Sequence, residues 1–193
     1  MMSSKEEILG KCRTQQDYPI PRLDDIAAVK YPDPLTQFVA MSAAVGGKVV
    51  ELQPGKDINH LLRSLFPEAV NIASNLPEIS LANRNPDTVG SAAELDGTDL
   101  GVVRGEIGVA ENGCIWVPQT MKERAVCFIS ENLVILLPKE AIVNNMHEAM
   151  KRIRVGDYGY GCFISGPSKT ADIAQVLVMG AQAARSLTVV LLP

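Results

Sequence analysis

The chain has 193 residues and a mass of 20.8 kDa, and 47% of its residues are hydrophobic while 21% are charged. This composition is typical of a globular protein with one continuous core and excludes a fibrous repeat or a disordered chain. Acidic residues outnumber basic ones by 22 to 18, and the basic residues form no stripe. A nucleic-acid-binding protein is therefore not expected.

The start of the chain predicts a helical arm. Ser3 or Ser4, followed by Glu6 and Glu7, is typical of a capping box that opens a helix running to about Arg13. Four prolines follow between residues 18 and 34, so we expect residues 1–34 to form a helix and a proline-marked tether outside the core. A secretory signal would need an apolar stretch in place of the charged first helix. We expect a cytoplasmic protein without membrane contact.

The next segments alternate between strand and helix patterns. Asp33 and Pro34 predict the start of a helix that ends at Gly46-Gly47. A strand over 48–52, a helix from Asp57 to about Leu65 and a strand over 69–73 follow. This alternation predicts parallel strands joined by crossover helices.

The second half of the chain adds further strands. The segment 75–98 is weakly patterned, with a short helix near 89–95, and short strands follow over 100–103, 107–110 and 114–117. The apolar runs 132–137 and 187–192 predict central strands covered on both faces. A helix over 140–154, a strand over 160–165 and a helix over 171–179 complete the pattern. The predicted fold class is α/β: a doubly wound, mostly parallel sheet with helices on both faces, plus the N-terminal arm.

Residues suited to metals and redox cofactors are sparse. The four cysteines form no Cys-x-x-Cys pair, and the two histidines, His60 and His147, lie inside helical patterns. No glycine-rich dinucleotide fingerprint follows a strand. We expect no metal site and no cofactor bound by this chain.

One candidate site is the segment Ser165-Gly166-Pro167-Ser168-Lys169-Thr170-Ala171-Asp172, which joins a predicted strand to a predicted helix. Such junctions bind ligands in open α/β sheets. Helix-start amides, the hydroxyls of Ser168 and Thr170 and the Lys169 ammonium are suited to a carboxylate or phosphate. The alternative is a turn followed by a helix cap, with Asp172 in the first helical turn.

A second candidate is the turn Glu111-Asn112-Gly113. Asn112 and Gly113 are explained by a tight hairpin turn. Glu111, flanked by apolar residues, is a candidate acid, base or nucleophile with a raised pKa, the alternative being a solvated loop glutamate. Arg104 is either a surface ion pair with Asp96, Asp99 or Glu106 or a carboxylate anchor. We expect the two turns to converge at one rim of the sheet.

The run from Phe163 to Ile173, together with Gly101 to Gly113, resembles the LUD domain of lactate-utilisation proteins of the LutC and YkgG type. The Gly46 to Val50 junction and the closing segment Gly180 to Leu191 are also similar, so the resemblance covers roughly residues 35–193. It implies a fold like that of the sugar-phosphate isomerase and CoA-transferase superfamily. The chain departs from the family pattern at Ala174 and at Gln182-Ala183-Ala184, where the family often has a glutamate and a His-Gly-Pro.

The resemblance also implies a function. It indicates a non-redox subunit of a system that oxidises L-lactate to pyruvate, binding a small organic acid or its iron-sulfur partner subunits, which carry the clusters. Ala110-Glu111-Asn112-Gly113 is similar to the element that carries the nucleophilic glutamate of CoA transferases, so an acyl-transfer enzyme using Glu111 is the alternative. A metabolite-binding sensor without turnover is a third hypothesis, and self-association of the chain stays open.

Overall fold

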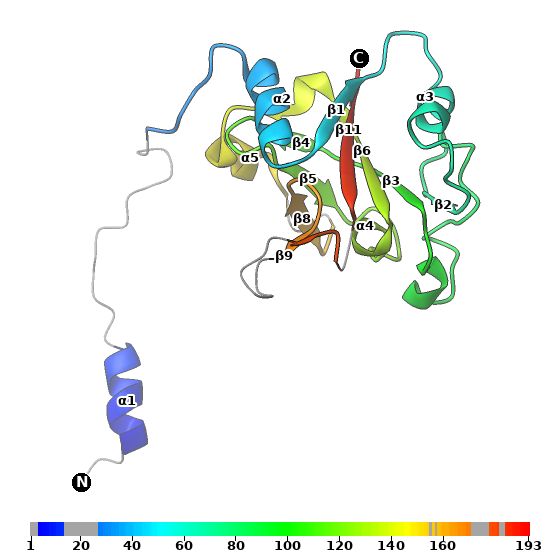
Figure 1. Ribbon diagram of the computed structural model, residues 1–193. Coiled ribbons are helices and arrows are strands. Elements are labelled where there is room, and N and C mark those ends of the chain that lie inside the picture. Colours follow the sequence, from blue (N-terminus) through cyan, green and yellow to red (C-terminus); the bar gives the residue numbers. More distant parts are fainter. Residues whose placement is uncertain (1–3, 14–26, 155, 157, 171–177, 182–183) are drawn as a thin grey trace.

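The computed structural model describes residues 4–13, 27–154, 156, 158–170, 178–181 and 184–193. Helix α1 (Ser4–Arg13) has the predicted extent and lies apart from the α/β body (Figure 1). Side chains from Ser4 to Gly10 are exposed. The division into an arm of residues 1–34 and a domain of residues 35–193 stays a prediction.

The body is built around a five-stranded sheet in which all neighbouring strands are parallel. Its order is β1 (Lys48–Glu51), β11 (Ser186–Leu192), β6 (Asn132–Pro138), β3 (Leu100–Arg104) and β2 (Ile72–Ala73). In its centre Val189 lies opposite Ile135 on one side and Val49 on the other. The predicted parallel α/β fold and the central position of the two apolar strands are confirmed.

Both faces of this sheet are covered, as its apolar strands require. On one face, Val134 and Leu136 pack with Leu62 of α3 (Ile58–Leu65). On the other, Ile135 packs in a second cluster with Phe38 of α2 (Pro34–Ala44). The short α4 (Val126–Ile129) contributes to the same second cluster. Successive residues of β6 therefore serve opposite cores, which explains why the strand is continuously apolar.

A second sheet of four strands lies on the α2 side of the molecule. Its order is β7 (Ile142–Val143), β4 (Ile107–Val109), β5 (Ile115–Pro118) and β8 (Gly161–Ile164). The sequence predicted three of these strands without indicating a separate sheet. Trp116 is buried against Phe163, with ring centroids 5.1 Å apart, as expected for a core residue.

The predicted helix over 140–154 is wrong in its first half. Lys139–Ala141 form a 3-10 turn (η3), Ile142–Val143 form β7, and α5 spans only Met146–Arg152. Asn145 caps α5 by accepting a hydrogen bond from Glu148 N, which sets a later start. Met150, on α5, is 50% exposed.

The predicted helix over 171–179 is also wrong at its end. Val178–Met179 form β10, which pairs antiparallel with β9 (Lys169–Thr170). Residues 171–177 lie outside the described part of the chain. The segment after Ser165 therefore enters a strand at Lys169–Thr170, next to the position where the sequence suggested a helix cap.

The remaining helical elements are short. The helix expected near 89–95 is the 3-10 helix η2 (Ala92–Leu95), which carries a Ser91–Glu94 capping box. Among the described residues the longest helix is α2 with 11 residues, and none has both the length and the apolar character needed to cross a membrane.

Candidate functional site

Glu111 lies in the tight turn between β4 and β5. Its carboxylate oxygen Oε2 accepts a hydrogen bond of 2.9 Å from Met146 N, the first residue of α5. The helix dipole favours an acidic group at this place. The neighbours Ala110 and Ile115 are fully buried, but Glu111 itself is exposed. The sequence predicted apolar surroundings for this carboxylate. The structure places it instead in an exposed position at the start of α5.

The start of α5 gathers a network of polar groups beside Glu111. Glu148 Oε2 accepts from Asn144 N at 2.9 Å, and this hydrogen bond is the main reason why the pKa of Glu148 is lowered. Asn144 Oδ1 accepts from Tyr31 N at 2.8 Å, while Asn145 Nδ2 donates to Val29 O at 2.7 Å. Two asparagines therefore fix the segment 29–31, which leads into α2, beside the Glu111 turn.

The Asn112-Gly113 pair forms the predicted hairpin turn. Asn112 Oδ1 accepts from Cys114 N at 3.1 Å, and Gly113 N donates to Val109 O at 2.9 Å. Gly113 has a φ of +65°, and a Cβ there would lie 2.8 Å from Ser42 N in α2. Glycine is required here because of its backbone conformation and because α2 passes so close.

The segment Ser165 to Thr170 lies at the amino edge of the central sheet. Ser168 N donates to Ala184 O at 2.9 Å, shortly before β11 begins, and Lys169 Nζ donates to Val45 O, shortly before β1. Val45 is the C-cap of α2, where a cation is favoured by the helix dipole. Open α/β sheets bind ligands at the opposite, carboxyl edge. The positional argument for an anion site therefore does not apply.

The rest of this segment is explained by packing. Gly166 has a φ of +66°, and a Cβ at this position would overlap Val45 O. Thr170 pairs with Val178 in the β9–β10 ribbon, and Asp172 lies outside the described residues.

The two turns meet, but their charged groups do not bond to each other. Ser165 Oγ donates to Asn112 O at 3.2 Å, and Gly113 and Gly166 both pack against the backbone of the last two turns of α2. The Glu111 carboxylate bonds to α5, whereas the Lys169 ammonium bonds to the end of α2. The expected convergence is thus made by backbone and packing contacts.

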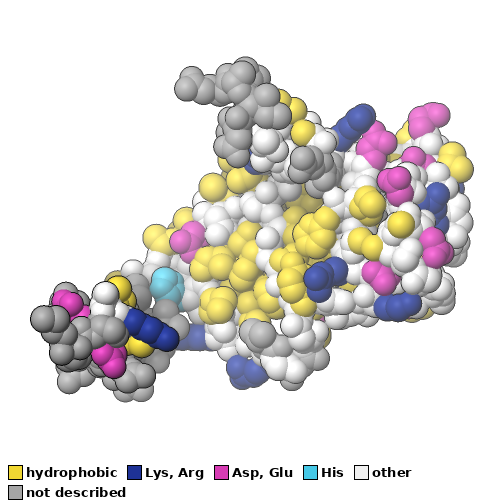
Figure 2. Space-filling view, turned by 90° about the horizontal axis from the view of Figure 1, so that it is seen from below, with side chains coloured by type: hydrophobic (Ala, Val, Ile, Leu, Met, Phe, Trp, Pro, Cys, Tyr) yellow, Lys and Arg dark blue, Asp and Glu magenta, His cyan; other side chains and the backbone are white. Residues whose placement is uncertain are grey.

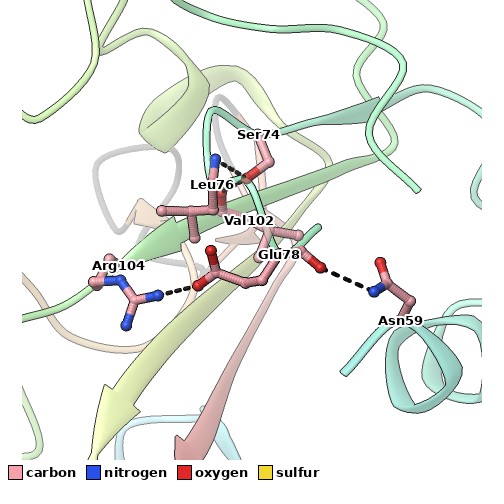
Figure 3. A network of polar contacts seen from close by, with 6 residues as sticks. All are labelled: Asn59, Ser74, Leu76, Glu78, Val102 and Arg104. Atoms are coloured by element: carbon pink, nitrogen blue, oxygen red, sulfur yellow. Dashed lines mark hydrogen bonds and ion pairs between the residues drawn. The ribbon is translucent and has the colours of Figure 1, made fainter. Parts of the chain in front are cut away.

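Arg104 ends β3 at the carboxyl edge of the sheet, and its guanidinium forms an ion pair with Glu78 (Figure 3). The sequence proposed Asp96, Asp99 or Glu106 as partners, so the partner is corrected. Both side chains are more than a third exposed, and such pairs contribute about 0–1 kcal/mol.

The Glu78 segment is held by neutral hydrogen bonds. Ser74 Oγ donates to Val102 O at 2.8 Å, and Asn59 Nδ2 donates to Glu78 O at 2.9 Å (Figure 3). These bonds tie residues 74–78 to β3 and α3.

The sequence reasoning missed a polar pocket that follows β2. It has a volume of about 480 Å³ and is lined by residues from two stretches, 74–79 and 82–88. The available signal was the pair Ser74-Asn75 directly after a buried strand, followed by Asn83 and Asn85. Polar residues at the carboxyl end of a parallel strand mark a candidate ligand site.

An apolar surface lies around α4. Phe128, Ile129 and Tyr160 are 40%, 36% and 36% exposed, and the Arg124 guanidinium lies 4.4 Å from the Tyr160 ring centroid. Figure 2 views this end of the molecule and shows hydrophobic side chains gathered with Lys and Arg side chains beside them. Exposed apolar groups of this kind mark interaction surfaces.

The described cysteines are poorly suited to nucleophilic chemistry. Burial raises the pKa of the Cys127 thiol to about 12 and that of Cys114 to about 11. Burial also raises the pKa of Cys162. The thiolate is the reactive form, so these residues behave as small hydrophobic side chains near neutral pH.

Sequence comparisons relate the chain to known proteins. Residues 87–192 match the family model described as LUD domain. The chain is 33% identical over 110 residues to Lactate utilization protein C of Shouchella clausii (strain KSM-K16), a match covering 54% of this chain and 48% of that relative. It is 26% identical to Lactate utilization protein C of Geobacillus sp. (strain WCH70), with 92% of this chain and 74% of the relative covered.

A solved structure supports the fold. The crystal structure of a DUF162 family protein from Deinococcus radiodurans superposes with a TM-score of 0.66 at 15% identity. The match covers 86% of this chain and all of that one.

Proposed function

Because the chain belongs to the LUD domain family, we propose that it acts in lactate utilization as the non-redox component of a system that oxidises L-lactate to pyruvate. The observation that carries this proposal is the similarity to relatives named Lactate utilization protein C, one of which matches 92% of this chain. The match to the first of these relatives spans about half of its length, 48%. A cytoplasmic location is part of the proposal.

In this proposal the electron-transfer steps belong to iron-sulfur partner subunits. The four cysteines of this chain form no Cys-x-x-Cys pair, and the pKa values of Cys114 and Cys127 are far above neutral. Cluster ligands are thiolates held at close spacing. This chain would then bind a small organic acid or organise the partners.

The surface around α4 is suited to such a partner. Phe128, Ile129 and Tyr160 offer exposed apolar area, and Arg124 adds a cation stacked on Tyr160. Aromatic and arginine side chains dominate the energetics of many protein interfaces. We propose that this surface contacts a partner subunit.

The test is a deletion strain complemented with variants. We expect deletion to abolish growth on L-lactate and the wild-type gene to restore it, and affinity purification to recover an iron-sulfur protein. F128E should lose both growth and copurification. M150E, which changes an apolar residue on α5 that is 50% exposed against 40% for Phe128, should keep them. Normal growth of the deletion strain, with no iron-sulfur protein recovered, would refute the proposal.

Acyl transfer on Glu111 is a second candidate function. Its carboxylate is exposed on a turn, where an acyl donor can reach it. The Glu111 carboxylate would attack an acyl thioester to give a mixed anhydride and release the thiolate, which would then attack the glutamyl carbonyl to give an enzyme thioester and the free carboxylate. Hydroxylamine traps either intermediate. E111Q keeps an acceptor for Met146 N but removes the nucleophile, so it separates chemistry from helix capping. Equal acyl-transfer rates in E111Q and the wild type would exclude this function.

A further inference from the structure

A groove lies beside α4, lined by side chains from η2, from residues 119–125 and from α4 itself. Its volume is about 550 Å³, and its lining includes Ala92, Gln119, Lys122, Arg124, Ala125 and Phe128. A smaller hollow lined by Tyr160 shares Gln119, Arg124 and Phe128 with it. The groove is therefore continuous with the exposed apolar surface around α4.

The floor of the groove is apolar because of the way α4 divides its side chains. Val126 and Cys127 are buried in the core on the α2 side of the central sheet. The next two residues of the same helix, Phe128 and Ile129, are 40% and 36% exposed. Apolar area gathered in a hollow is typical of a surface that another molecule covers.

Two cations of the groove have no acidic partner. Lys122 Nζ donates to a backbone carbonyl oxygen at 2.9 Å. The Arg124 guanidinium lies over the Tyr160 ring and donates to Gln119 Oε1 at 3.4 Å. Neither cation forms an ion pair with a carboxylate that the structure describes, although Glu123 lies between them in the sequence. The groove thus combines an apolar floor with two positive charges that its own side chains leave uncompensated.

Resting on the proposed contact with a partner subunit, we infer that this groove receives a short segment of that partner in which an apolar side chain is flanked by carboxylates. The apolar side chain covers Ala125 and Phe128, and the carboxylates pair with Lys122 and Arg124. A carboxylate can accept two parallel hydrogen bonds from a guanidinium, which makes such a pair directional. A basic segment of the same shape would place like charges together and is disfavoured.

The experiment is amide NMR of the full chain titrated with two capped synthetic hexapeptides, DEFLED and its charge-reversed counterpart KKFLKK. Concentrations reach about 5 mM, because contacts of this size bind in the millimolar range. We expect DEFLED to shift the signals of Ala125, Phe128 and Ile129 and to bind at least about tenfold more tightly than KKFLKK. Raising the salt concentration from about 0.05 M to about 0.5 M should remove most of this preference, because it shortens the screening length. Equal binding of the two peptides, or no shift at α4 with either, would overturn the inference.

Charge reversal on the protein supplies a matched test. K122E/R124E should bind KKFLKK more tightly than DEFLED, and it should fold normally because both side chains are exposed. K48E/K56E changes two exposed lysines in and after β1 by the same total charge and should keep the wild-type preference. A peptide preference that K122E/R124E leaves unchanged would contradict the inference.

A membrane surface is the other class of partner suited to an apolar and cationic groove. Vesicles of phosphatidylcholine and phosphatidylserine that bind the wild type but not K122E/R124E, with neither peptide binding, would assign the groove to lipid and overturn the inference. None of these measurements uses L-lactate, so their outcome is separate from that of the growth test. Peptide selectivity without a growth defect on L-lactate would support the acidic partner and refute the lactate role alone.

Discussion

Replacing Gly113 by alanine tests whether the Glu-Asn-Gly turn is shaped by packing. The left-handed backbone, with φ of +65°, costs an L residue roughly 1–2 kcal/mol. The new Cβ would lie 2.8 Å from Ser42 N and 2.9 Å from Met41 C. These are backbone atoms of α2 at the buried Ser42, which cannot rotate away as a side chain could, and such overpacking costs about 1–3 kcal/mol. We expect G113A to lower the free energy of unfolding by about 2–5 kcal/mol.

Gly97 provides a matched control. Its φ of +67° is nearly the same, but an added Cβ would meet no heavy atom within 4 Å. G97A should therefore cost only the conformational part, roughly 1–2 kcal/mol. Urea unfolding followed by Trp116 fluorescence measures both variants, because the single tryptophan lies in the second sheet. A G113A variant as stable as G97A would refute the packing argument.

Three further predictions concern charged and thiol groups. E111A should lower the free energy of unfolding by about 1 kcal/mol by freeing Met146 N, and E111Q should lower it less; equal losses in urea unfolding would contradict the capping role. The folded pKa of Glu148 lies below its ordinary 4.5, so its stabilising contribution is present above about pH 4.5 and is lost as the pH falls through the lower folded value. Unfolding of E148Q between pH 7 and pH 3 should show a weaker acid dependence than the wild type, and an unchanged slope would count against it. Alkylation at pH 8 with mass spectrometry should leave Cys114 and Cys127 unmodified until unfolding, and rapid native labelling of either thiol would be inconsistent with its raised pKa.

The central strands were predictable because burial on both faces leaves a local mark. The segments 132–137 and 187–192 are continuously apolar since their alternate side chains enter different cores. The helix start at Pro34 was predictable for a similar reason, because Asp33 caps it with its own side chain. Local chemistry was sufficient in these segments.

The errors arose where distant pairing overrides the local pattern. Ile142 and Val143 fit a helical spacing, but they pair with Gly108 and Val109 of β4. Val178 and Met179 pair instead with the nearby β9 (Lys169–Thr170), so distance in the sequence does not explain this second error. The partner strand β4 lies more than about 30 residues before β7, outside any local sequence window. Its pairing turns Ile142–Val143 into a strand where the local pattern predicted a helix.

The candidate site shows the same limit. A strand followed by a hydroxyl-rich turn predicts a ligand loop only if the strand belongs to the parallel sheet. β8 instead pairs antiparallel with β5 in the second sheet, and the turn that follows it reaches the amino edge beside Ala184. The sequence could not indicate which sheet, and therefore which edge, the turn would join. The pocket beside Asn75 was missed because its polar residues follow a strand of only two residues, which leaves too short a pattern in the sequence.

These placements give the motif residues a common structural role. Gly113, Gly166 and Lys169 come from the two segments that carry the family resemblance, and all three contact α2 between Met41 and Val45. They fasten the turn before β5, the turn after β8 and the start of β9 to the helix that covers the first sheet. Loss of any of them should therefore appear as lost stability before lost chemistry. Glu111 is different, because its exposed carboxylate contacts the start of α5 and not α2. A stable E111Q variant that no longer supports growth on L-lactate would therefore assign chemistry to this carboxylate, whereas normal growth would leave the turn a structural signature of the family.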